Sequence, residues 1–137
     1  MPQTFTCDGA NMSPPLVIED VLKEAQSLAL IVDDPDATRG GTFTHWLVWN
    51  ISPKTMEFQE SEAPRGAVEG RNDFGNEGYG GPCPPRGAKS HRYMFKLYAL
   101  DKILDLRRGA EKDKLKRAME GHILEQTTLM GLYARAI

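Results

Sequence analysis

The sequence predicts a mostly β protein: a β-sandwich with one or two short helices near the C-terminus. Short apolar or alternating segments recur along the chain, and long loops rich in glycine and proline separate them. Helical periodicity appears only late, after residue 110. A βαβ fold would instead alternate strands and helices throughout. The 137 residues have the usual size of one domain, so we expect a single domain over residues 1–137.

Two predicted strands flank a polar loop in the first third of the chain. Residues 27–33 (SLALIVD) form a short apolar run rich in β-branched side chains. Residues 34–44 (DPDATRGGTFT) have the Asp, Gly and Thr content of a loop. Residues 45–51 (HWLVWNI) are aromatic and β-branched again, which favours a second strand.

An antiparallel hairpin of these strands would bring Asp34 close to His45, because both ends of a hairpin loop lie at the same end of the sheet. Strict alternation along the second strand would place His45 on the face of Leu47, Trp49 and Ile51, opposite Trp46 and Val48.

A stiff loop precedes the next long strand. Residues 53–90 are rich in glycine, proline and charge, with one short strand expected near 66–70. The end of this region, GYGGPCPPRGAKS (78–90), leads directly into HRYMFKLYAL (91–100). The alternation of this strand puts five side chains on one buried face: His91, Tyr93, Phe95, Leu97 and Ala99.

The C-terminal part carries the helical signal. From Glu111 to about Leu124, apolar spacing predicts a helix, and the final LMGLYARAI favours another strand. The helical face would consist of Leu115, Ala118, Met119, His122 and Ile123, with His122 packed rather than functional.

Composition excludes several classes of function. The net charge of −2 and the pI near 5.9 argue against nucleic-acid binding. The first 16 residues have no basic start and no apolar core, so we expect no signal peptide; the longest apolar run, residues 28–32, is too short to span a bilayer, so we expect a cytoplasmic protein. Cys7 and Cys83 form no CxxC motif and should be free thiols in a reducing compartment. The sequence leaves open whether the fold joins them.

The strand ends provide the candidate site. His45 and His91 each begin a strand directly after a loop, and Asp34 and Asp36 begin the loop before His45. An imidazolium donates hydrogen bonds and carries positive charge, while glycines let backbone N–H groups approach a ligand closely. Both features suit a phosphate-like anion. A carboxylate paired with a histidine would fix its tautomer, and it could also accept from the ammonium of a zwitterionic head group.

Simpler explanations exist for each feature alone. A histidine at a strand end is often structural, the DPD segment is turn chemistry, and the proline-glycine loop can be scaffold. Their coincidence at the strand ends favours a pocket. Metal binding and cofactors are not expected, because no HxH spacing occurs and His45 and His91 come from separate segments. Ser90 and His91 are neighbours on opposite faces and cannot form a dyad, and Cys83 is more easily explained as structural than as a nucleophile.

The chain resembles the phosphatidylethanolamine-binding protein family, also called Raf-kinase-inhibitor-like proteins, in its short bacterial and archaeal branch. The DPDA–HWLV and GPxPPxG–HRY pairs are specific when taken together. The matching segments are SPPL (13–16), DDPDA (33–37), HWLVWNI (45–51), GYGGPCPPRG (78–87), HRYMFKLYAL (91–100), GHIL (121–124) and GLYAR (131–135).

The resemblance implies a Greek-key β-sandwich with a small anion pocket for phosphate-like anions or phospholipid head groups. Some family members inhibit serine proteases or kinases, and prokaryotic relatives are often homodimers. Two departures concern the loops: Thr38 replaces a common proline, and no tryptophan follows SPPL. The ligand-binding residues carried over are Asp34, His45, Gly81, Pro82 and His91, with Asp36, Pro84 and Tyr93 close by.

We therefore expect a non-enzymatic anion-binding protein. The alternatives are an inhibitor of a protease or kinase that acts through a surface loop, and an enzyme on a small phosphorylated or amine-bearing substrate.

Overall fold

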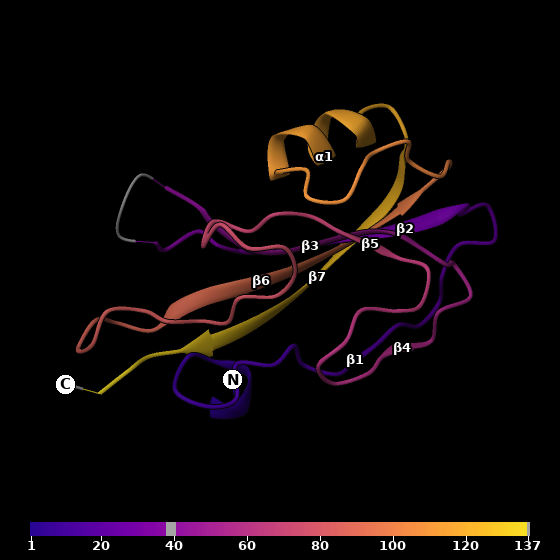
Figure 1. Cartoon of the computed structure of the whole chain (residues 1–137). Helices are drawn as coiled ribbons and strands as arrows, with labels where there is room; N and C mark the ends of the chain where they lie inside the picture. Colours follow the sequence, from indigo (N-terminus) through magenta and orange to yellow (C-terminus); the bar gives the residue numbers. More distant parts are fainter. Residues whose placement is uncertain (38–40, 137) are drawn as a thin grey trace.

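The computed structural model describes residues 1–37 and 41–136, and it is mostly β, with two antiparallel sheets (Figure 1). The larger sheet has the strand order β5-β3-β2-β6-β7, and the smaller sheet pairs β1 with β4. Thr38 lies outside the described residues. The elements are a 3₁₀ turn at Gln3–Phe5, β1 (Leu16–Val17), β2 (Ser27–Asp34), β3 (Phe43–Ile51), β4 (Glu57–Phe58), β5 (Val68–Glu69), β6 (His91–Leu100), α1 (Lys112–Met119) and β7 (Ile123–Tyr133).

The large sheet is covered on both faces, and each face has its own apolar cluster. Figure 1 shows α1 on one side of the sheet, where Leu115 and Met119 are buried against it. The β1–β4 pair and the N-terminal segment lie on the other side, where Phe58 is buried against the sheet. Strands β2 and β3 are buried along almost their whole length, which explains their near-continuous apolar sequences.

The sequence prediction of the three central strands is confirmed. Strand β6 has the predicted bounds, and β2 and β3 differ from prediction by one or two residues at one end. The short strand expected near 66–70 is present as β5. The prediction missed β1 and β4, because two-residue strands have no measurable periodicity.

Two β-bulges correct the predicted faces of β3. Register shifts fall between Leu28 and Leu30 and between Val32 and Asp33, where β3 carries one residue more than β2. The extra residues reset the alternation. His45 and Ile51 therefore lie on the side of Trp46 and Val48, and of the four residues predicted to share a face, Leu47 and Trp49 face the helix side. The bulge at His45 turns its imidazole toward Tyr93 of β6, at a ring distance of 5.3 Å.

The C-terminal helix is shorter than its sequence periodicity predicts. Helix α1 ends at Met119, and Gly121 has a φ of 77°, a backbone conformation that favours glycine and terminates the helix. The prediction that His122 and Ile123 extend the helical face was wrong. His122 lies in the turn, with Nδ1 2.8 Å from Oδ1 of Asp101, and Ile123 begins β7.

Strand β7 forms one edge of the large sheet and is exposed along most of its 11 residues. It pairs with β6 from His91↔Tyr133 to Leu100↔Ile123. None of the helices in the described ranges is long and apolar enough to cross a membrane.

Candidate functional site

A cavity of about 260 Å³ opens where β2 ends and where β3 and β6 begin. The two strand ends predicted to meet do meet, because β2 pairs with β3 on one side and with β6 on the other. The residues that line the cavity are Asp34, Ala37, Phe43, His45, Phe74, Cys83, Pro84, Pro85, His91 and Tyr93.

Asp34 and His91 form a buried pair in the cavity wall. His91 Nδ1 lies 2.6 Å from Asp34 Oδ2, and the two side chains are only 7% and 5% exposed. The other carboxylate oxygen of Asp34 accepts a hydrogen bond from the backbone N–H of Asp36 at 2.7 Å. Because a carboxylate accepts, Nδ1 of His91 carries the hydrogen, and Nε2 is the nitrogen left for a ligand.

His45 has a different hydrogen-bond partner from His91. Its Nδ1 lies 2.7 Å from the carbonyl oxygen of Gly80, which can only accept, so Nδ1 is again the protonated nitrogen. Among the residues that the structure describes, no carboxylate hydrogen-bonds to the ring. Burial lowers the pKa of His45 below its ordinary value, although the Gly80 carbonyl and the charge of Asp34 act in the opposite direction. His45 is therefore neutral near pH 7, with Nε2 as an acceptor.

Aromatic rings make up much of the remaining wall, and the sequence analysis did not single out two of them. The Phe43 ring lies 4.9 Å from the His45 ring and 4.8 Å from the Phe74 ring. Tyr93, which was predicted, stacks on His91 at 6.3 Å, and burial raises the pKa of its phenol. Phe43 could have been found from its position two residues before His45, but Phe74 lies in a turn with no such signal.

Three of the predicted residues lie outside the cavity wall. The carboxylate of Asp36 faces Arg92, with Oδ2 accepting from Nε at 2.9 Å, and these hydrogen bonds lower the pKa of Asp36 to about 2. Gly81 donates its N–H to Asn11 Oδ1 at 2.8 Å. Pro82 accepts a hydrogen bond from the backbone N–H of Cys7 at 3.1 Å.

The glycines of the loop serve packing rather than close approach of a ligand. A Cβ at position 81 would lie 2.4 Å from both Asn11 Oδ1 and the Phe5 carbonyl oxygen. A Cβ at position 80 would lie 2.3 Å from a ring carbon of Phe74. These glycines therefore allow the loop to dock on the N-terminal segment and on the aromatic wall.

The two cysteines form a disulfide, which corrects the expectation of free thiols. Cys7 and Cys83 are 76 residues apart in sequence, and their Cα atoms lie 5.4 Å apart. The fold joins them because residues 80–83 run along the N-terminal segment, with hydrogen bonds on both sides of the disulfide. Cys83 also lines the cavity.

Asp33, the residue before Asp34, lies on the face of the sheet opposite the cavity. Asp33 is fully buried, and its Oδ2 lies 3.3 Å from Lys96 Nζ and 2.7 Å from Lys112 Nζ. Lys112 is the first residue of α1, so this cluster fixes the helix to the end of β2. Within the described residues, no group of three or more His, Cys, Asp or Glu side chains is arranged to hold a metal ion.

Comparison with known proteins identifies the family. The sequence profile of the phosphatidylethanolamine-binding proteins matches residues 1–134. A UPF0098 protein of Pyrococcus abyssi is 51% identical over 142 residues, covering 98% of this chain and 79% of the relative. Another, from Methanothermobacter thermautotrophicus, is 51% identical over 140 residues, covering 98% and 91%.

Two solved structures share the fold. One is CT736 of Chlamydia trachomatis, described as a phosphatidylethanolamine-binding protein homologue, with a TM-score of 0.91, 43% identity and coverage of 98% and 88%. The other is YBCL of E. coli, described as a new member of the mammalian family, with a TM-score of 0.87, 33% identity and coverage of 95% and 84%. From its sequence and its fold, the chain belongs to the phosphatidylethanolamine-binding protein family.

Proposed function

We propose that the protein binds a phosphate-like anion or a phosphorylated head group in the cavity between His45 and His91, without catalysing a reaction. The observation that carries the proposal is the buried Asp34–His91 pair, which shares one small cavity with the second imidazole. Asp34 fixes the ring of His91 through Nδ1 and leaves Nε2 as the nitrogen for a ligand, where a protonated imidazole would donate its Nε2–H to a phosphate oxygen.

The charges in the cavity favour one form of the anion. When His91 is protonated, its charge and that of Asp34 cancel, and burial lowers the pKa of His45, which favours its neutral ring. A fully ionised phosphate would place a lone pair against the acceptor Nε2 of His45. A monoprotonated phosphate or phosphate monoester instead offers an oxygen to His91 and a P–OH donor to His45. A zwitterionic head group also offers a donor, through its ammonium.

The size and lining of the cavity limit the rest of the ligand. A volume of about 260 Å³ lies just below the usual range of pockets for drug-sized ligands, about 300–1,000 Å³. It suits a phosphate with a short substituent better than a whole lipid. Phe43 and Phe74 offer an apolar surface against which such a substituent can pack.

The disulfide favours binding over covalent catalysis. Cys83 is the cysteine that lines the cavity, and its sulfur is bonded to Cys7, so it is not available as a thiolate nucleophile. The Asp34–His91 pair could orient a general base. Turnover of any member of a phosphoester panel, with a pH profile altered by His91→Ala, would replace the binding proposal with an enzymatic one.

The test is a thermal-shift titration with inorganic phosphate, followed by phosphoethanolamine. We expect Tm to rise with ligand concentration in the wild type and in His122→Ala, the control at a half-exposed histidine outside the cavity. The shift should disappear in His91→Ala. An equal shift in His91→Ala, or no shift in the wild type, would refute the proposal.

Inhibition of a protease or a kinase through a surface loop stays the alternative. It differs in one measurable respect, because cavity variants such as His91→Ala would inhibit as well as the wild type. Cytoplasmic location and a homodimer are further expectations from the sequence; light scattering tests the homodimer directly.

A further inference from the structure

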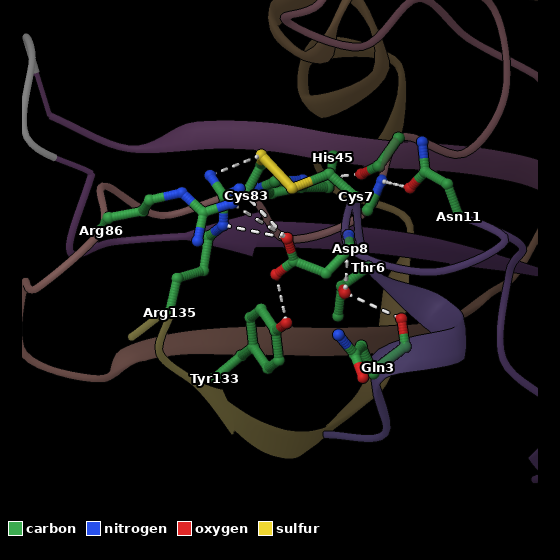
Figure 2. The surroundings of a disulfide bond; sticks show 12 residues. Gln3, Thr6, Cys7, Asp8, Asn11, His45, Cys83, Arg86, Tyr133 and Arg135 are labelled. Atoms are coloured by element: carbon green, nitrogen blue, oxygen red, sulfur yellow. Dashed lines mark hydrogen bonds and ion pairs between the residues drawn. A yellow bond between two sulfur atoms is a disulfide. The ribbon is translucent and has the colours of Figure 1, made fainter. Parts of the chain in front are cut away.

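The Cys7–Cys83 disulfide lies at the edge of the candidate cavity, and its surroundings differ from those of a purely structural disulfide. Cys83 is exposed, and together with Pro84 and Pro85 it forms one wall of the cavity. Figure 2 shows the disulfide beside Asp8, Arg86 and Arg135. Disulfides that solvent thiols can reach are the ones open to exchange.

Residues 82–85, which include this wall, have few backbone N–H groups that could hold them to the rest of the fold, so the disulfide is their main attachment. Three of the four residues 82–85 are prolines, which have no backbone N–H to donate. In the described part of the chain, the N–H of Cys83 has no hydrogen-bond partner either. The wall is held by its carbonyls and by flanking bonds, such as Gly87 N–H to the Arg135 carbonyl at 2.9 Å. The disulfide is thus its covalent attachment to the rest of the fold.

A guanidinium lies beside the sulfur of Cys83. Arg135 Nη1 is 3.5 Å from Cys83 Sγ, while Nε and Nη2 of the same side chain face Asp8 Oδ1 at 3.2 and 3.0 Å. Asp8 therefore holds the guanidinium in place with one edge turned to the sulfur. A cation in this position stabilises a thiolate, which makes Cys83 the better leaving group of the two cysteines.

We propose that the Cys7–Cys83 disulfide is a thiol-exchange site that controls anion binding in the adjoining cavity. This inference rests on the proposed function of that cavity. A low-molecular-weight thiolate attacks Sγ of Cys7, the Cys7–Cys83 bond breaks, and the electron pair leaves on Sγ of Cys83, beside Arg135. A second thiolate then attacks the small-molecule sulfur of the mixed disulfide, so that the electron pair leaves on Sγ of Cys7. It releases the oxidised small disulfide and leaves a dithiol protein.

The consequence for binding follows from what the bond holds. Reduction frees the wall at residues 83–85 while the backbone bond from Cys7 N–H to the Pro82 carbonyl keeps the neighbouring segments docked. A thiolate at Cys83 also places negative charge in the cavity wall, which repels an anion. Both effects weaken binding without requiring the chain to unfold.

The experiment measures the Kd for inorganic phosphate by calorimetry at 25 °C, with and without dithiothreitol. We expect the reduced wild type to bind about fivefold or more weakly, which is the low end of typical coupling between sites. The Cys7→Ser/Cys83→Ser variant has neither the disulfide nor a thiolate. It should bind like a reduced wild type that carries no charge at Cys83, and its affinity should not change with dithiothreitol. Equal affinities of the oxidised and reduced wild type would overturn the inference but leave the proposed function intact. Absence of binding in both states would refute the proposed function, and this inference with it.

Two further measurements test the folding of the reduced chain and the role of Arg135. Circular dichroism on the same samples establishes whether the reduced chain stays folded; an unfolded reduced chain would overturn the proposal, because control of binding requires a folded reduced state. The rate of reduction by dithiothreitol tests the leaving group. Arg135→Gln should slow it several-fold relative to Arg86→Gln, the control at an arginine that is 61% exposed and lies 4.0 Å from Asp8. Equal rates in the two variants would refute the role of Arg135.

Discussion

Removing His91 while leaving Asp34 in place should destabilise the fold by about 3–5 kcal/mol, because it leaves a buried carboxylate without its partner. The Nδ1–Oδ2 distance is 2.6 Å and both side chains are almost fully buried, so the carboxylate loses a short hydrogen bond at a site with little exposure to water. The bond from the Asp36 N–H remains and places His91→Phe toward the lower end of this range. Asp34→Asn should cost only about 1–2 kcal/mol, since the amide oxygen still accepts from Nδ1 of His91.

A double-mutant cycle separates this interaction from the packing of the ring. Urea unfolding at pH 7 of the wild type, His91→Phe, Asp34→Asn and the double variant should give a coupling free energy of about 1–3 kcal/mol. The matched control is the half-exposed His122–Asp101 pair at 2.8 Å, where the same changes should couple by less than about 1 kcal/mol. Additivity within about 0.5 kcal/mol at Asp34 and His91 would refute the reasoning.

Three other predictions follow from the structure. The disulfide closes a loop with a sequence separation of 76 residues, so Cys83→Ser should cost about 4.5 kcal/mol and lower Tm by roughly 15 °C in a calorimetric scan. Because the pKa of His45 is lowered from 6.5 in the folded state, unfolding free energy measured by urea should fall as pH drops below about 6.5, and His45→Asn should reduce this slope. Gly81→Ala should destabilise by about 1–3 kcal/mol through its clash with Asn11 and the Phe5 carbonyl, whereas Gly131→Ala, which meets only the end of the Met1 side chain, should cost less in the same assay.

The sequence was sufficient to predict where the cavity would lie. Strands β2, β3 and β6 have apolar or alternating patterns long enough to recognise, and connection geometry places their polar ends together. This reasoning brought Asp34, His45 and His91 to one site. The detailed direction of His45 was wrong, because a β-bulge adds one residue to one strand and reverses the alternation beyond it. The sequence near His45 contains no signal for that bulge, because β3 has no glycine.

The cavity residues that come from loops were harder to predict than the charged residues at the strand ends. Phe74 and Cys83 come from loops, and a loop has no period from which the direction of a side chain can be counted. Cys83 reaches its place through Cys7, which is 76 residues away. Pairing at that distance depends on the tertiary fold, so composition and spacing could not choose between free thiols and a disulfide.

The loop glycines illustrate how one sequence signal can have two physical origins. Glycine in a loop beside histidines suits close approach of a ligand, and it equally suits close approach of another part of the chain. The positions where a Cβ would clash decide between these origins: Gly80 meets Phe74, and Gly81 meets Asn11 and Phe5. The backbone N–H of Gly81 is already bound to Asn11, so it is not free for an anion. Under the proposed function, recognition of the anion then rests on the imidazoles. This is why substitutions at His91 and His45 should change binding directly, while substitutions at Gly81 should act mainly through stability.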